Sequence, residues 1–113
     1  MAFDSSNLSA QPLSGVVYFD RRELELLLRL YGRMVASGHW RDYAIDALPR
    51  AAVFSVFRRA CETPIYRIEK RPGLGQKQGA WSVSAHGGLV IRRGPELAQV
   101  LRVFDRARFS LVE

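Results

Sequence analysis

Short apolar runs alternate with arginine, lysine and glycine through residues 50–93, which read RAAVFSVFRRACETPIYRIEKRPGLGQKQGAWSVSAHGGLVIRR. Within this segment, residues 64–71 (PIYRIEKR) alternate, with arginine and glutamate on one side and tyrosine and isoleucine on the other. A period of two residues is typical of a strand with one buried face. Residues 52–59 (AVFSVFRR) are largely apolar on both sides, as expected of a central strand. The segment therefore predicts an antiparallel sheet.

Further strands extend this sheet. Residues 80–85 (AWSVSA) and 89–93 (LVIRR) flank His-Gly-Gly at 86–88, where glycine allows the positive φ of a tight hairpin turn. Upstream, residues 43–48 (YAIDAL) have the pattern of a strand, and Pro49 ends it. We therefore expect four to five antiparallel strands.

A helix is predicted before the sheet. Asp20 can cap its free amides and Glu23 can reach back to the cap, which together form a capping box. Apolar residues then recur at the spacing of one helix face, and Gly38 ends the pattern. This apolar stripe consists of Leu24, Leu27, Leu28, Tyr31, Met34 and Val35. We place this helix at residues 20–37.

A second helix is predicted after the sheet. Gly94-Pro95-Glu96 marks its start, since proline suits the first helical position and an acid suits the first turn. The apolar residues of 97–104 form its buried stripe. We expect an α+β fold in which this C-terminal helix and the N-terminal helix pack on one face of the sheet. Residues 1–15 are expected to form a disordered tail, and residues 16–113 a single domain.

Length and composition exclude several classes of protein. The chain has 113 residues, and none of its apolar runs approaches the ~20 residues of a membrane span. Its start lacks the basic-then-apolar pattern of a secretory signal, so we expect a cytoplasmic protein without membrane contact. The single cysteine, Cys61, excludes an internal disulfide and a cage of thiolates around a metal.

Charge is unevenly distributed. The net charge is +6, but residues 1–49 carry five arginines and six acids, a net −1, whereas residues 50–113 carry twelve basic residues and five acids, a net +7. Clustered cations favour a polyanionic partner, nucleic acid first. The alternative is a basic protein without any role in nucleic-acid binding.

The open, polar face of the predicted sheet is the candidate site for DNA or RNA. Arginine suits a phosphate backbone because it makes bidentate contacts. We expect Arg67 and Arg92 to share this face with Ser82 and Ser84. The candidate nucleic-acid-binding residues are Arg58, Arg59, Arg67, Lys70, Arg71, Lys77, Arg92 and Arg93. The alternative interpretation is a solvated face whose charges protect against edge pairing.

Few aromatic residues are expected to be available for stacking on bases. Tyr66, Trp81 and Trp40 are the candidates, and most other aromatic residues fit the core. Binders of single strands usually combine a cationic groove with exposed aromatics. The sequence therefore favours recognition of the backbone over recognition of the bases.

No catalytic, cofactor or metal site is predicted. Residues 71–79 (RPGLGQKQG) resemble a phosphate-binding loop, but glutamine follows Lys77 where a P-loop has serine or threonine, and a strand follows instead of a helix. His39 and His86 lack clustered acids, so they do not make a metal site. Nothing in their spacing to Cys61 supports a nucleophile pair.

The alternative function is a protein-interaction or regulatory subunit. Leu26 and Leu30 lie outside the main apolar stripe of the first helix and widen its apolar surface. We expect this surface to dimerise or to dock on a partner, because burying each leucine contributes about 1.5–3 kcal/mol.

Three segments together resemble a known family. They are residues 18–35, from YFDRREL to YGRMV, residues 40–46 (WRDYAID), and residues 52–72, from AVFSVFRR to YRIEKRP. They resemble a family of small alphaproteobacterial proteins of unknown function, over about residues 16–105. The resemblance implies a cytoplasmic bacterial protein, and it carries no catalytic residue.

Overall fold

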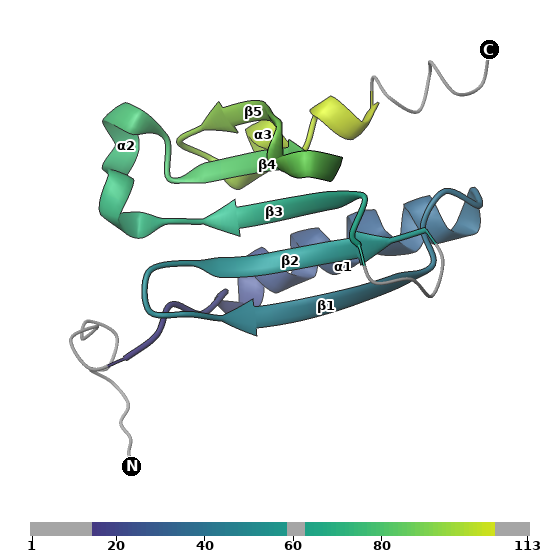
Figure 1. Ribbon diagram of the computed structural model, residues 1–113, viewed down its shortest axis with the longest axis horizontal. Helices are drawn as coiled ribbons and strands as arrows, with labels where there is room; N and C mark the ends of the chain where they lie inside the picture. Colours follow the sequence, from purple (N-terminus) through teal and green to yellow (C-terminus); the bar gives the residue numbers. More distant parts are fainter. Residues whose placement is uncertain (1–14, 59–62, 106–113) are drawn as a thin grey trace.

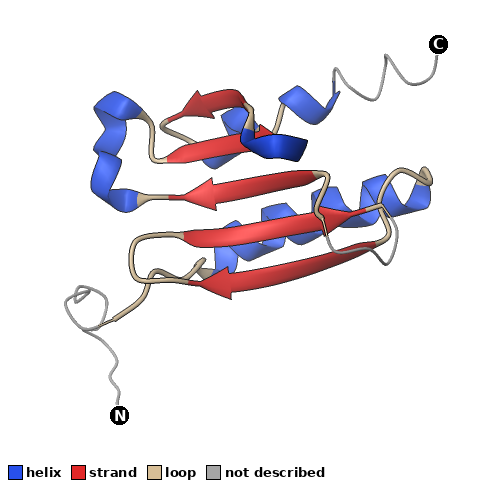
Figure 2. Cartoon of the chain, in the orientation of Figure 1, coloured by secondary structure: helices blue, strands red, loops and turns tan. Residues whose placement is uncertain are grey.

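The computed structural model describes residues 15–58 and 63–105. Five antiparallel strands form one sheet in the order β1-β2-β3-β4-β5, so each strand pairs with its neighbours in the chain (Figures 1 and 2). The elements are α1 (Arg21–Ala36), β1 (Asp42–Ala47), β2 (Ala52–Phe57), β3 (Tyr66–Lys70), η2 (Pro72–Leu74), α2 (Gly75–Gln78), β4 (Trp81–Ala85), η3 (His86–Gly88), β5 (Val90–Gly94) and α3 (Leu97–Val100). The predicted α+β class and antiparallel sheet are confirmed. Residues 1–14, most of the predicted tail, lie outside the described residues.

Helix α1 begins where the capping box predicted. The Asp20 carboxylate accepts a hydrogen bond from the Glu23 amide at 2.8 Å, and Glu23 Oε1 accepts one from the Asp20 amide at 2.8 Å. Gly38, with φ of +82°, follows the helix and lets the chain turn towards β1. Both ends of α1 are therefore set by local sequence.

The buried stripe of α1 differs from the prediction. Leu27, Leu30 and Met34 are buried, whereas Leu28 and Val35, predicted inside the stripe, are 39% and 38% exposed. The stripe is displaced towards Leu30 because the C-terminal segment packs on that side of α1. No described element covers the side of Leu28 and Val35.

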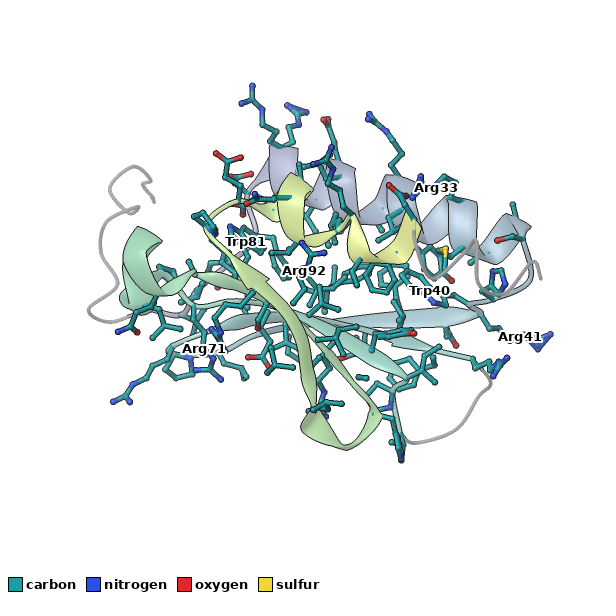
Figure 3. The ribbon with its side chains drawn as sticks, turned by 90° about the horizontal axis from the view of Figure 1, so that it is seen from above. Arg33, Trp40, Arg41, Arg71, Trp81 and Arg92 are labelled. Carbon is teal, nitrogen blue, oxygen red and sulfur yellow. The ribbon has the colours of Figure 1, made fainter. Side chains whose placement is uncertain are left out.

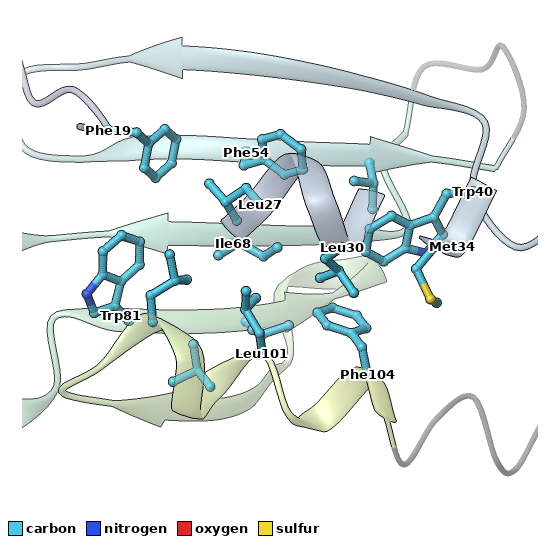
Figure 4. Close-up of a cluster of buried hydrophobic side chains, with 14 of the residues drawn as sticks. Phe19, Leu27, Leu30, Met34, Trp40, Phe54, Ile68, Trp81, Leu101 and Phe104 are labelled. Atoms are coloured by element: carbon cyan, nitrogen blue, oxygen red, sulfur yellow. The ribbon is translucent and has the colours of Figure 1, made fainter. Parts of the chain in front are cut away.

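The core lies between the helices and one face of the sheet (Figure 4). Residues that are paired across neighbouring strands point to the same face, so the register identifies the side chains on the covered face. Phe54, Ile68 and Val83 lie in one such row and are fully buried. We call this the covered face, and we call the opposite side of the sheet the open face.

The C-terminal helix is shorter than predicted. Helix α3 has four residues, and no side-chain hydrogen bond caps its N-terminus. It contacts β4 and β5, and its apolar residues join the same core as those of α1, on the same face of the sheet (Figure 3). In this region Leu97, Val100, Leu101 and Phe104 are buried, as their spacing predicted.

The segment between β3 and β4 is a pair of short helical turns, η2 and α2. Gly79 then returns the chain to β4 with φ of +84°.

In the described part of the chain, none of the helices has the length and apolar character required to cross a bilayer.

Candidate functional site

The register places two rows of side chains across the open face. One row runs Ala44, Ser55, Arg67, Ser84 and Val90, from β1 to β5. The second row runs Asp46, Val53, Glu69, Ser82 and Arg93. Asp42 and Phe57 pair beyond the first row. On the open face, long charged side chains therefore alternate with small serines, and the surface they form is polar and has little relief.

Three serines are buried although no described element covers the open face. Ser55, Ser82 and Ser84 are 6%, 5% and 7% exposed. The register flanks them with Arg67 and Arg93, whose long stems can lie over small neighbours. Their hydroxyls make no hydrogen bond to another group in residues 15–58 and 63–105. A buried hydroxyl needs a partner, so these three favour a polar ligand or water on this face.

Charge on the open face is divided between its two sides. Arg67 and Arg93 lie on β3 and β5, and Arg71 joins them because its Nε donates to Glu69 Oε1 at 3.0 Å. Asp42 and Asp46 lie on β1, at the opposite edge. We define the basic half-face as Arg67, Arg71, Arg93, Ser82 and Ser84. It carries three positive charges against the one negative charge of Glu69.

Two predicted site residues point to the covered face. Arg92 pairs with the buried Val83, which places it on the side of the helices (Figure 3). A register irregularity between Val83 and Ser84 sets this orientation, and the sequence pattern does not show it. The prediction that Arg92 shares a face with Arg67 is therefore wrong.

Lys70 is the second such residue, and the fold already engages its ammonium group. It donates to Glu23 Oε1 at 2.7 Å and to the Tyr18 carbonyl oxygen at 2.9 Å. The same nitrogen lies 5.9 Å from the centre of the Trp81 ring. Lys70 thus joins α1 to the sheet on the covered face.

The other predicted cations are dispersed. Arg58 follows β2 and, with Arg41 and Trp40, lines a shallow groove of about 540 Å³ at the C-terminal end of α1. Arg59 and Cys61 lie outside the described residues. Lys77 belongs to α2, and its side chain is not among those described. Of the eight predicted residues, the structure brings Arg67, Arg71 and Arg93 together.

The aromatic residues considered for base stacking are directed into the core. Trp40 and Trp81 are 3% and 7% exposed, and Tyr66 packs edge-on against Phe104 with ring centres 5.0 Å apart. Among the strand residues, the aromatic side chain on the open face is Phe57. The open face therefore offers cations and hydroxyls, with little surface for stacking.

A second surface lies on the helix side of the sheet, between α1 and the C-terminal segment that contains α3. It is a cavity of about 180 Å³ with a floor of leucine and alanine and a rim of charged residues. We call it the interhelical groove. It is lined by Leu26, Arg29, Leu30, Arg33, Ala98, Leu101, Arg102 and Asp105.

Comparison with known proteins places the chain in a family. The family model described as "Protein of unknown function (DUF2794)" matches residues 17–101, from the approach to α1 to the end of α3. The chain belongs to the DUF2794 family. No curated protein matches this DUF2794 chain. No solved structure matches it either.

The interhelical groove of this DUF2794 chain contains both predicted interface residues. Leu26 is half-buried on its wall, and Leu30 is only 4% exposed on its floor, because Leu101 packs nearby. Leu30 is therefore a core residue that the groove reaches, although its spacing placed it outside the main apolar stripe. Its role in an interface stays a prediction. The neighbouring Arg29 and Arg102 were missed. Arg29 precedes Arg33 by one helical turn, and that spacing was the available signal.

No metal centre is present among the described residues. They contain no group of three or more histidine, cysteine, aspartate or glutamate residues close enough to hold an ion. His39 Nδ1 lies 3.1 Å from Ser37 Oγ, just beyond the end of α1. The side chain of His39 thus belongs to the local turn.

Proposed function

We propose that this DUF2794 chain is a non-catalytic nucleic-acid-binding module, and that the basic half-face contacts the phosphate backbone. The observation that carries the proposal is the combination of Arg67, Arg71 and Arg93 with the unpartnered hydroxyls of Ser82 and Ser84. Arginine and serine side chains both bind phosphate oxygens. Arg67 and Arg93 form no ion pair with another described residue. Arg93 Nη1 donates to the Gly79 carbonyl oxygen at 3.3 Å, a neutral acceptor that leaves its positive charge uncompensated.

Asp42 and Asp46 make the β1 edge of the open face acidic, and this edge restricts where a polyanion can bind. Asp42 and Asp46 repel phosphate on the β1 side, while the cations attract it on the β3–β5 side. A strand of nucleic acid is thereby directed along one half of the face. Because Phe57 is the aromatic that the strands offer there, the contacts are expected to be to phosphate and sugar, with little preference for base sequence.

Charge reversal at two arginines tests the proposal. Arg67→Glu with Arg93→Glu removes two contacts to charged groups, each contributing about 1.5–3 kcal/mol. We expect affinity for a fluorescent oligonucleotide, measured by anisotropy at constant salt, to fall at least about tenfold. The matched control is Arg41→Glu with Arg50→Glu, which changes the net charge equally at exposed positions outside the half-face. Equal losses in both double variants would show that net charge alone attracts the ligand, and would contradict the assigned site.

A second candidate function is protein binding through the first helix. It is favoured by the interhelical groove, where Leu26 forms an apolar wall beside unpaired arginines. Dimerisation through the same helix stays a prediction. Sedimentation analysis of the wild-type protein and of Leu26→Glu distinguishes dimerisation from docking on a different protein. If this surface holds a dimer, the wild-type protein sediments as a dimer and the variant as a monomer.

A further inference from the structure

We propose that the interhelical groove binds an acidic amphipathic segment of a partner protein. The groove lies on the helix side of the sheet, whereas the basic half-face lies on the open side (Figure 3). The proposal rests on the second candidate function, whose occupant it names. It is independent of nucleic-acid binding, and either one can fail without the other.

The floor of the groove is apolar. Leu26 is half-buried, Ala98 is exposed, and Leu101 is 9% exposed beneath them. Among the described residues, α1 and the segment from Ala98 to Asp105 enclose a cavity of about 180 Å³ that no other described side chain fills. An apolar side chain of a partner can fill this space and remove Leu26 and Ala98 from water, which is favourable in proportion to the area buried.

The rim of the groove is cationic. Arg29 and Arg102 are exposed, and neither forms an ion pair with another residue in the part of the chain that the structure describes. Arg33 approaches Asp105 at 3.4 Å, with both side chains about half exposed at 47% and 52%. Such an exposed pair contributes little to stability and can rearrange when a ligand arrives. Arg29 and Arg102 thus provide two unpaired positive charges at the groove.

These features together specify the chemistry of the occupant. A phosphodiester backbone supplies anions but no apolar group for the leucine floor, whereas an acidic amphipathic helix supplies both. Helices commonly bind in this way, with apolar residues at i, i+3, i+4 and i+7 in a groove and charged residues at its rim. We therefore assign leucine-like side chains to the floor and carboxylates to Arg29 and Arg102.

A charge-swap experiment tests the assignment. The probe is a fluorescein-labelled helical peptide with leucines at i, i+3, i+4 and i+7 flanked by glutamates, and the control peptide carries lysines in place of the glutamates. The wild-type chain is expected to bind the glutamate peptide, with changes in the backbone amide signals of Ala98 and Leu101. Arg29→Glu with Arg102→Glu should lose at least tenfold in affinity for the glutamate peptide and gain affinity for the lysine peptide. Arg67→Glu with Arg93→Glu should leave peptide binding unchanged.

Three results would overturn the proposal. The first is absence of binding of the glutamate peptide to the wild-type chain at millimolar concentration. The second is binding that the reversal of Arg29 and Arg102 leaves unchanged. The third is loss of oligonucleotide binding in that variant while the variant with reversed Arg67 and Arg93 retains it, which would assign the groove to nucleic acid. Circular dichroism of each variant establishes that it is folded.

Discussion

Lys70 fastens the first helix to the sheet, because Glu23 accepts its shortest hydrogen bond, at 2.7 Å. Both side chains are about four-fifths buried, at 19% and 20% exposure. Lys70→Met keeps the apolar stem but leaves the Glu23 carboxylate without this donor, so we expect the free energy of unfolding to fall by about 1–3 kcal/mol. Urea denaturation measures the loss. Oligonucleotide affinity should stay unchanged, and a loss of affinity at unchanged stability would show that Lys70 contacts the ligand instead.

Tyr31 links α1 to the start of β1. Its hydroxyl donates to the Arg41 carbonyl oxygen at 2.6 Å, and its ring packs edge-on against Tyr43. Burial raises the pKa of Tyr31 above the usual value for tyrosine, and Asp42 and Tyr43 raise the pKa further. A raised pKa in the folded state means that the stabilisation is complete below pH ~10, the unfolded pKa, and is lost as pH rises through the folded value.

The pH dependence of stability checks this link. We expect Tyr31→Phe to be less stable than the wild-type chain at neutral pH by about 0.5–1.5 kcal/mol, the contribution of one hydrogen bond. Above pH ~10 the difference should shrink, because Tyr31 then loses its proton in the unfolded chain while the folded chain still holds it, which favours unfolding of the wild-type protein. Thermal unfolding of both proteins from neutral pH to above pH ~10 measures this difference in stability. A difference that stays constant with pH would contradict the role of the hydroxyl.

Substitution by alanine at Gly32 and at Gly79 should change the free energy of unfolding in opposite directions. Gly32 lies inside α1, and a Cβ there meets nothing within 4 Å. Gly32→Ala should therefore raise the free energy of unfolding by about 0.5–1 kcal/mol, because alanine favours the helix. At Gly79, φ is +84° and a Cβ would lie 2.9 Å from Arg93 Cγ and 3.1 Å from the Gly94 amide nitrogen.

Gly79→Ala should consequently lower the free energy of unfolding by about 1–3 kcal/mol, through left-handed strain and contact with backbone. Chemical denaturation of both variants gives the comparison. A stabilised Gly79→Ala variant would mean that the connection from α2 to β4 differs from the one described, since no alanine is expected to be favourable there.

Local sequence patterns predicted where α1 and the strands lie. They did not predict which side chains face the core, because tertiary contacts determine this. The capping box located α1, and strict alternation located β3, because both signals depend on neighbours in sequence. The buried side of α1 depends on where α3 packs, so Leu30 was misplaced. Likewise, the face of Arg92 depends on a register irregularity between β4 and β5. One residue of slip moves a side chain to the other face, and the sequence does not show that slip.

The candidate site was predicted only in part for the same reason. Alternation within one strand placed Arg67 and Arg71 together correctly. Lys70 follows the same alternation onto the covered face, where Glu23 from α1 meets it, and that contact spans 47 positions in the chain. A net charge of +6 likewise says nothing of how cations are divided between faces. The unpaired arginines of the interhelical groove come from α1 and the segment after α3, so their proximity required the fold.

Across the whole molecule, the acidic β1 edge should limit binding of polyanions to the open face. Neutralising it with Asp42→Asn and Asp46→Asn removes repulsion while leaving the basic half-face intact. We expect oligonucleotide affinity to rise about twofold to fivefold at low salt, and this gain to vanish above about 0.5 M salt because exposed charges are screened. Anisotropy titrations at both salt concentrations check this. Unchanged affinity at low salt would place the ligand far from β1.

The salt dependence of oligonucleotide binding tests the central claim most directly. Three arginines neutralising three phosphates give a plot of log K against log salt with a slope of about −3 for duplex DNA and about −2 for a single strand. Arg67→Glu with Arg93→Glu should reduce the magnitude of the duplex slope to about 1, whereas Arg41→Glu with Arg50→Glu should leave it near 3. Absence of binding at low salt, or a slope that reversal of Arg67 and Arg93 leaves unchanged, would contradict the account.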